Sequence, residues 1–264
     1  MIKKIDIDNL KIACWINPRG FGDHQQSLIF IHGSGGDHTS WVYQYARLNN
    51  QFNIVAVDLP GHGSSTGNGA KNLDQYCVWI KKLLDVLQLK NPVLIGHSLG
   101  AAITLKVALQ YPEIVNAIVP VGGGIKMPVN TDLLTGLKTN PSRIIDLFCN
   151  FSLAPENRPK LLEALKKSLY KINVDVMYDD LCACNDLDLT DNIDKINLQG
   201  LILCGMKDKM TPAQFSCEIA ARIKGARLSL IGGAGHMVML EKPEEFNKVL
   251  CEFASSISKA AYSV

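Results

Sequence analysis

The sequence predicts an α/β fold: a mostly parallel eight-stranded sheet with helices on both faces. Two observations predict this fold, namely unbroken apolar runs that recur along the chain and helical spacing of apolar residues between them. Buried parallel strands are covered on both faces, so they are continuously apolar rather than alternating. A third observation is that residues 124–192 contain no strong strand pattern, which predicts an inserted helical segment.

The predicted strands begin with an antiparallel hairpin, because residues 2–7 and 11–16 alternate around the turn residues Asp8 and Asn9. Later strands, more continuously apolar, are expected near 27–32, 53–58, 92–97, 115–121, 200–204 and 227–231. Amphipathic helices are expected at 71–89, 98–110, 212–224 and 243–258. Pro212 and Pro243 stand where helix starts tolerate proline.

The inserted segment interrupts this alternation of strands and helices. It begins after Gly122 and Gly123 and ends in the polar region from Asp186 to Lys195. We therefore expect a core made of residues 1–123 and 193–264, and a helical cap or lid at 124–192. Such insertions over the carboxyl ends of strands shape the substrate cavity and exclude water from it.

Composition indicates a compact protein without a polyanionic partner. The chain has 264 residues and a formal net charge of +2, so it offers no strong electrostatic footprint for nucleic acid or an anionic membrane. No apolar run approaches the length of a membrane span. A small-molecule substrate is the expected partner, and the chain is expected to be a monomer or a homodimer.

The eight cysteines are expected to be reduced thiols. Several lie inside predicted strands or helices, and the start of the chain does not resemble a signal peptide, which together predict a cytoplasmic location. Cys182 and Cys184 are too closely spaced for usual zinc ligands and lack a partner pair or histidine nearby. We expect neither a metal nor a cofactor.

The stretch Gly96-His97-Ser98-Leu99-Gly100 is the most informative motif. It follows the apolar run 92–95 and precedes a helical pattern, so Ser98 is expected in a tight turn between strand and helix. Residues without bulk two positions to either side let the backbone adopt a strained conformation there. The turn also places Ser98 at a helix N-terminus, which favours developing negative charge. Ser98 is therefore the candidate nucleophile.

Two downstream residues complete a catalytic pattern in the order nucleophile, acid, histidine. Asp208 and His236 each follow an apolar run that predicts a buried strand, at the edge where open α/β sheets place their sites. Serine needs a base to take its proton, and a neutral imidazole needs a carboxylate that fixes its tautomer. In isolation, Asp208 is typical of a turn aspartate and His236 of a surface histidine. Together in this order they predict a triad.

Other polar residues near the motifs have alternative interpretations. His32, His62 and His97 sit in glycine-flanked turns, where imidazole can bond to neighbouring backbone, and the structural interpretation is favoured for each. Asp37 and Asp58 are interpreted as carboxylates that fix turns and loops. Asp132 is the rival acid, but it lies well past Val121 in the predicted cap, so Asp208 keeps the assignment.

These motifs resemble those of the α/β-hydrolase superfamily, and the resemblance covers nearly the whole chain. The stretch 28–36 resembles the family's oxyanion segment after the third strand, and 57–65 its loop after the fourth. The resemblance implies that the backbone N–H groups of Ser34 and Leu99 form an oxyanion hole. Such donors stabilise charge that exists only in the transition state.

Apolar residues of the predicted cap and of the acid and base loops are expected to line the substrate pocket. The candidates in the cap also have an alternative role in the cap's own core. The pocket candidates are Met127, Phe148, Phe151, Leu153, Met177, Tyr178, Met210 and Met237.

The sequence thus predicts a serine esterase that cleaves esters or thioesters with small to medium apolar groups. Hydrolysis of a carbon–carbon bond in a diketone is the enzymatic alternative, and acyl transfer or perhydrolysis is also open. A serine at the turn argues against the dehalogenase and epoxide hydrolase branches, which use aspartate there. A ligand-binding receptor built on the same scaffold is the alternative of another class.

Overall fold

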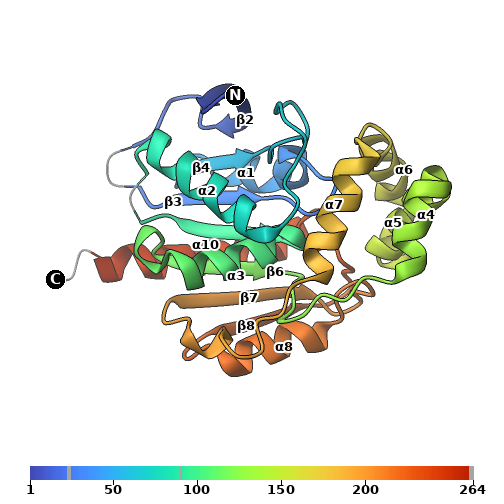
Figure 1. Ribbon diagram of the computed structural model, residues 1–264. Helices are drawn as coiled ribbons and strands as arrows, with labels where there is room; N and C mark the ends of the chain where they lie inside the picture. Colours follow the sequence, from blue (N-terminus) through green and yellow to red (C-terminus); the bar gives the residue numbers. More distant parts are fainter. Residues whose placement is uncertain (23–24, 90, 262–264) are drawn as a thin grey trace.

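A computed structural model describes residues 1–22, 25–89 and 91–261, with backbone alone for 258–261, and contains one mixed sheet (Figure 1). The strand order is β1-β2-β4-β3-β5-β6-β7-β8. β2 pairs antiparallel with β1 and β4, and all other pairs are parallel. The strands are β1 Ile2–Ile7, β2 Leu10–Ile16, β3 Ser27–Ile31, β4 Asn53–Val57, β5 Val93–His97, β6 Ala117–Val121, β7 Gln199–Gly205 and β8 Arg227–Ile231.

Helices cover both faces of the sheet, because side chains of each strand point alternately to the two faces. On one face α2 (Leu73–Leu87), α3 (Leu99–Gln110) and α8 (Ala213–Arg222) bury residues such as Ile29 and Ile31. On the other face α1 (Val42–Leu48), α9 (Val238–Glu241) and α10 (Pro243–Ala261) bury residues such as Leu28 and Phe30. Short 3₁₀ helices occur at His38–Trp41, Pro112–Ile114, Pro155–Asn157 and Ile193–Lys195.

Four helices lie between β6 and β7, at the carboxyl end of the sheet (Figure 1). They are α4 (Thr131–Thr139), α5 (Pro141–Ser152), α6 (Arg158–Leu169) and α7 (Val174–Asn185), and we call them the α4–α7 segment. The segment has a small hydrophobic core of its own, built around residues such as Leu137, Ile145 and Cys149. In Figure 1, α4, α5 and α6 stand out from the sheet while α7 runs back toward it.

A buried carboxylate joins α7 to the sheet. The Asp180 side chain is fully buried and accepts hydrogen bonds from Tyr76 Oη (2.6 Å) on α2 and from the backbone N–H of Gly35 (3.3 Å). It also pairs with His62 Nε2 at 2.8 Å. Burial alone would lower the pKa of His62, but the charge and hydrogen bond of Asp180 outweigh it and raise the pKa. The Asp180 carboxylate thus connects α7 to α2, to the loop that carries Gly35 and to the loop that carries His62.

The sequence predicted this architecture well. All eight strands occur within a few residues of their predicted positions, and the turn at Asp8 takes φ 51°. The helix α1 was missed, because seven residues are too few to establish a periodic pattern. None of the eight cysteines, all within the described residues, forms a disulfide. No helix in the described ranges is both long and apolar enough to cross a membrane.

Replacing Asp180 by asparagine tests whether its charge holds α7. The raised pKa of His62 means that the ion pair stabilises the fold fully below the unfolded value of about 6.5, and that this stabilisation is lost as pH rises through the folded-state pKa. We expect Asp180→Asn to lose about 2–3 kcal/mol of unfolding free energy at pH 6 and less at pH 9, measured by urea denaturation. Asp179→Asn, on the same helix, is the control. A loss that grows with pH would contradict this account.

Candidate active site

The turn between β5 and α3 holds Ser98 in a strained conformation. Its φ of 54° and ψ of −112° lie outside the regions that side chains usually favour. A Cβ on Gly96 would lie 1.9 Å from the Gly100 carbonyl oxygen, and one on Gly100 would lie 2.3 Å from that of Ile31. Only glycines allow this close approach. The turn leaves Ser98 with its hydroxyl free of any capping hydrogen bond and 9% of the residue exposed.

Asp208 lies just past the end of β7 and is buried. One carboxylate oxygen accepts the backbone N–H groups of Met210 (2.8 Å) and Thr211 (2.9 Å). The other lies 2.8 Å from His236 Nδ1. Burial alone would raise the pKa of Asp208, but the charge and hydrogen bond of His236 and these N–H groups outweigh it and lower the pKa. Asp208 is therefore ionised at neutral pH and accepts a hydrogen bond from His236 Nδ1.

The contact with Asp208 fixes the tautomer of His236. A carboxylate can only accept, so Nδ1 carries the proton and Nε2 presents its lone pair. Nε2 is buried and has no hydrogen-bond partner among the described residues. A buried, unpaired imidazole nitrogen next to a serine turn has the form of a general base that awaits a proton.

The loop that carries His236 is fixed by residues of α5 and α9. The backbone N–H of His236 donates to Ser152 O (2.9 Å) at the end of α5. The Glu241 carboxylate accepts the N–H groups of Gly235 (2.9 Å) and Ala154 (2.8 Å) and the side chain of Asn157 (2.7 Å). Burial raises the pKa of Glu241 despite these donors. The His236 loop is therefore held from the α4–α7 segment as well as from α9.

The predicted oxyanion donors lie beside Ser98. Leu99 is the first residue of α3, where backbone N–H groups lack an intrahelical acceptor. Ser34 lies in the loop after β3, and β3 pairs in parallel with β5, the strand before Ser98. The backbone N–H of Ser34 has no acceptor within the described part of the chain. Ser34, Ser98 and His236 line one small cavity together. Two such N–H groups near one serine can hold a developing oxyanion.

Two cavities meet at Ser98 and Phe148. The large cavity has a volume of about 360 Å³, and its walls include the pocket candidates Met127, Phe148, Phe151 and Met210. The small cavity has a volume of about 30 Å³, and its walls include Gly33–Gly36, His236 and Met237. The large one is mostly apolar because side chains of α4, α5 and α7 form its walls.

Three of the predicted pocket residues lie away from both cavities. Met177 is fully buried and packs inside the core of the α4–α7 segment, close to the backbone at Gly35. Tyr178 packs against the same core, and Leu153 against the core beneath α10. Conversely Leu181 and Cys184, neither of them predicted, line the large cavity.

Thr211 is a site residue that the sequence analysis missed. Its backbone N–H and hydroxyl both contact the Asp208 carboxylate, and the hydroxyl also reaches Gly122 O at 2.9 Å. A threonine three residues after an aspartate at a strand end is a signal for such a turn, because the aspartate accepts local backbone N–H groups.

The other histidines make the structural contacts that the sequence favoured. His32 accepts the Leu59 N–H at Nε2 (3.0 Å), and burial together with the nearby His62 lowers its pKa to about 4. His97 donates from Nε2 to His236 O (2.9 Å), and burial lowers its pKa well below the usual value. His97 thus supports the backbone of His236.

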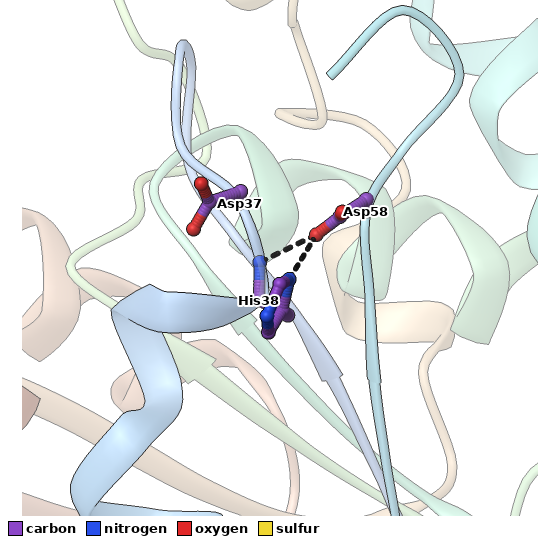
Figure 2. Close-up of side chains that lie close together, drawn as sticks. All are labelled: Asp37, His38 and Asp58. Atoms are coloured by element: carbon purple, nitrogen blue, oxygen red, sulfur yellow. Dashed lines mark hydrogen bonds and ion pairs between the residues drawn. The ribbon is translucent and has the colours of Figure 1, made fainter. Parts of the chain in front are cut away.

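Figure 2 shows Asp37, His38 and Asp58, whose ligand atoms lie within 4.8 Å of one another. Asp58 already accepts the N–H and Nδ1 of His38 (both 2.7 Å) and the N–H of Ser64 (2.8 Å). The Asp37 carboxylate points away from Asp58 and caps Thr39 N at 2.8 Å. These contacts fix two loops to each other, so a metal is not needed to explain the cluster.

Comparison with known proteins gives relatives along most of the chain. A 2-hydroxy-6-oxononadienedioate/2-hydroxy-6-oxononatrienedioate hydrolase of Pseudomonas is 25% identical over 285 residues, with 95% of each chain covered. A solved thermophilic esterase is 31% identical, with 97% of this chain and 98% of that one covered and a TM-score of 0.84. The chain spans 64% of a longer relative, 29% identical, the dihydrolipoyllysine-residue acetyltransferase component of the acetoin cleaving system of Pseudomonas putida.

The family model for the alpha/beta hydrolase family matches residues 28–249, a range that contains every predicted site residue from Ser34 to Met237. That match agrees with the strand order, the serine turn after β5 and the positions of Asp208 and His236 after β7 and β8. The chain belongs to the alpha/beta hydrolase family.

Proposed function

We propose that this hydrolase cleaves carboxylic esters or thioesters with small to medium apolar groups through an acyl-enzyme. The observation that carries the proposal is that Ser98, His236 and Ser34 line the same small cavity, with His236 Nε2 unpaired among the described residues. Asp208 supports the role of base for His236, because its ionised carboxylate fixes the imidazole tautomer.

The proposed reaction follows from these positions. Ser98 Oγ attacks the carbonyl carbon while His236 Nε2 takes its proton, and the carbonyl oxygen becomes an oxyanion beside the N–H groups of Ser34 and Leu99. His236 then gives the proton to the leaving oxygen or sulfur, and the bond to the acyl carbon breaks. Water, deprotonated by His236, attacks the acyl carbon, the bond from that carbon to Ser98 Oγ breaks, and His236 returns the proton to Ser98 Oγ as the acid leaves. No step requires a cofactor.

The α4–α7 segment has a proposed role as the cap, with residues 124–192 as its extent and 1–123 and 193–264 as the core. Its side chains at Met127, Phe148, Phe151 and Leu181 line the large cavity, which supports a role in substrate selection. An apolar wall excludes water from the acyl group and strengthens electrostatic interactions at the serine. The cytoplasmic location and the oligomeric state remain predictions.

A second candidate is hydrolysis of a carbon–carbon bond, favoured by the similarity to the oxononadienedioate hydrolase. Parallel assays with a chromogenic ester, a thioester and a vinylogous 1,5-diketone acid separate the reactions. We expect burst kinetics and the highest kcat/KM with the oxygen ester. Turnover of the diketone alone would overturn the proposal in favour of the second candidate. Binding of all three without turnover would instead support a non-catalytic receptor.

Replacing Ser98 by alanine tests the nucleophile. The hydroxyl makes no capping hydrogen bond, so we expect Ser98→Ala to keep its melting temperature while esterase kcat falls roughly 10³-fold or more. Labelling by a fluorophosphonate, followed by mass spectrometry, should vanish in this variant. Ser142→Ala, at an exposed serine of α5, serves as the control and should label normally. A labelled Ser98→Ala protein would refute the assignment.

The identity of the acid is tested by a pair of asparagine variants. We expect Asp208→Asn to lower kcat by a factor on the order of 10⁴, because asparagine can favour the wrong tautomer of His236. Asp132 is exposed in the first turn of α4, and Asp132→Asn should change kcat less than about twofold. Steady-state kinetics on one short ester measure both. The reverse ranking would move the acid into the α4–α7 segment.

A further inference from the structure

We propose that the two cavities divide the substrate, with the acyl group in the large cavity and the leaving group in the small one. The preferred substrates are then methyl esters of medium-sized apolar acids. This inference rests on the proposed ester cleavage and adds the substrate class. It also names Leu165 as the residue that limits the length of the alcohol.

The orientation of the substrate follows from the residues that line each cavity. The tetrahedral carbon has three substituents besides Ser98 Oγ: the oxyanion, the leaving oxygen and the acyl chain. The oxyanion lies beside Ser34, and the leaving oxygen must lie within about 3 Å of His236 Nε2 to receive its proton. Ser34 and His236 both line the small cavity, and neither lines the large one. The third substituent, the acyl chain, is therefore directed into the large cavity.

The sizes of the cavities set the size of each group. A site needs roughly 10–15 Å³ to hold one water-sized group. The small cavity, at about 30 Å³, therefore holds two or three such groups, namely the oxyanion, the leaving oxygen and about one carbon of the alcohol. The large cavity, at about 360 Å³ and mostly apolar, admits a medium-sized hydrocarbon. Once the alcohol has left, the small cavity has room for the water that releases the acid, next to its base.

Leu165 closes the small cavity on its outer side. A third cavity of about 190 Å³ lies between the 3₁₀ turn before α1 and helix α6, and it shares Ser40, Leu165, Ser168 and Met237 with the small cavity. These four residues form the partition between the two spaces. Of these four residues, only Leu165 and Met237 have large apolar side chains, and Met237 is next to His236 in the sequence. Leu165 is therefore the residue that can be shortened without changing a neighbour of His236. Shortening Leu165 would join the spaces and extend the room for the leaving group.

Two isomeric esters test the assignment. Methyl hexanoate and pentyl acetate have the same atoms, but one has a long acyl chain and the other a long alcohol. For the wild-type protein we expect kcat/KM to favour methyl hexanoate by at least about tenfold. Leu165→Ala should raise kcat/KM on pentyl acetate at least about fivefold while changing that on methyl hexanoate little. Leu161→Ala, which borders only the outer cavity on the same helix, is the matched control and should keep the wild-type ratio.

The outcomes are distinguishable. Equal rates on the two isomers, or a preference for pentyl acetate, would overturn the division of the substrate while leaving ester cleavage intact. Hydrolysis of neither isomer by protein that a fluorophosphonate labels at Ser98 would contradict both this inference and the proposed function. Melting temperatures are measured for each variant, and Leu165→Val replaces Leu165→Ala if the latter unfolds. If a folded Leu165 variant keeps the wild-type ratio of kcat/KM on the two esters, Leu165 does not limit the length of the alcohol.

Discussion

The close contact between β5 and α3 is the constraint on which the site depends. Gly96 and Gly100 approach each other so closely that any side chain at position 96 would collide with backbone. This contact forces Ser98 to a positive φ and leaves its hydroxyl uncapped at the start of α3. Backbone strain of this kind costs about 1–3 kcal/mol, and the surrounding packing must hold it. Here the buried strands on either side of β5 provide that packing.

Four buried carboxylates join the loops at the carboxyl edge of the sheet. Asp58 connects the loops after β3 and β4, and Asp180 connects α7 to Gly35 and His62. Asp208 orders the loop after β7 while it orients His236. Glu241 connects the His236 loop to the end of α5. Because each carboxylate accepts several donors, its removal would leave buried N–H groups unpaired, which costs more than one surface contact.

Local patterns explain how much of this was predictable. The strands, the serine turn and the candidates Asp208 and His236 follow from apolar runs and from the residues just after them, which are local features of the sequence. The roles of Asp180 and Glu241 were not predictable in this way. Asp180 lies 145 residues from Gly35, and its burial depends on how α7 packs. Met177 shows the same limit: its helix has one side toward the cavity and another toward its own core, and only packing decides between them.

Helix α5 contacts both the cavities and the loop that carries His236. Phe148 lines both cavities, and four residues later Ser152 accepts the backbone N–H of His236. The Ser152 hydroxyl donates to Phe148 O (2.7 Å) and contacts Met210 Sδ at 3.0 Å, beside the acid. Phe148 is therefore linked through Ser152 to the loop that holds His236. The wall shared by the two cavities and the carbonyl that holds His236 thus belong to the same turn of one helix, which ties the position of His236 to a segment outside the sheet.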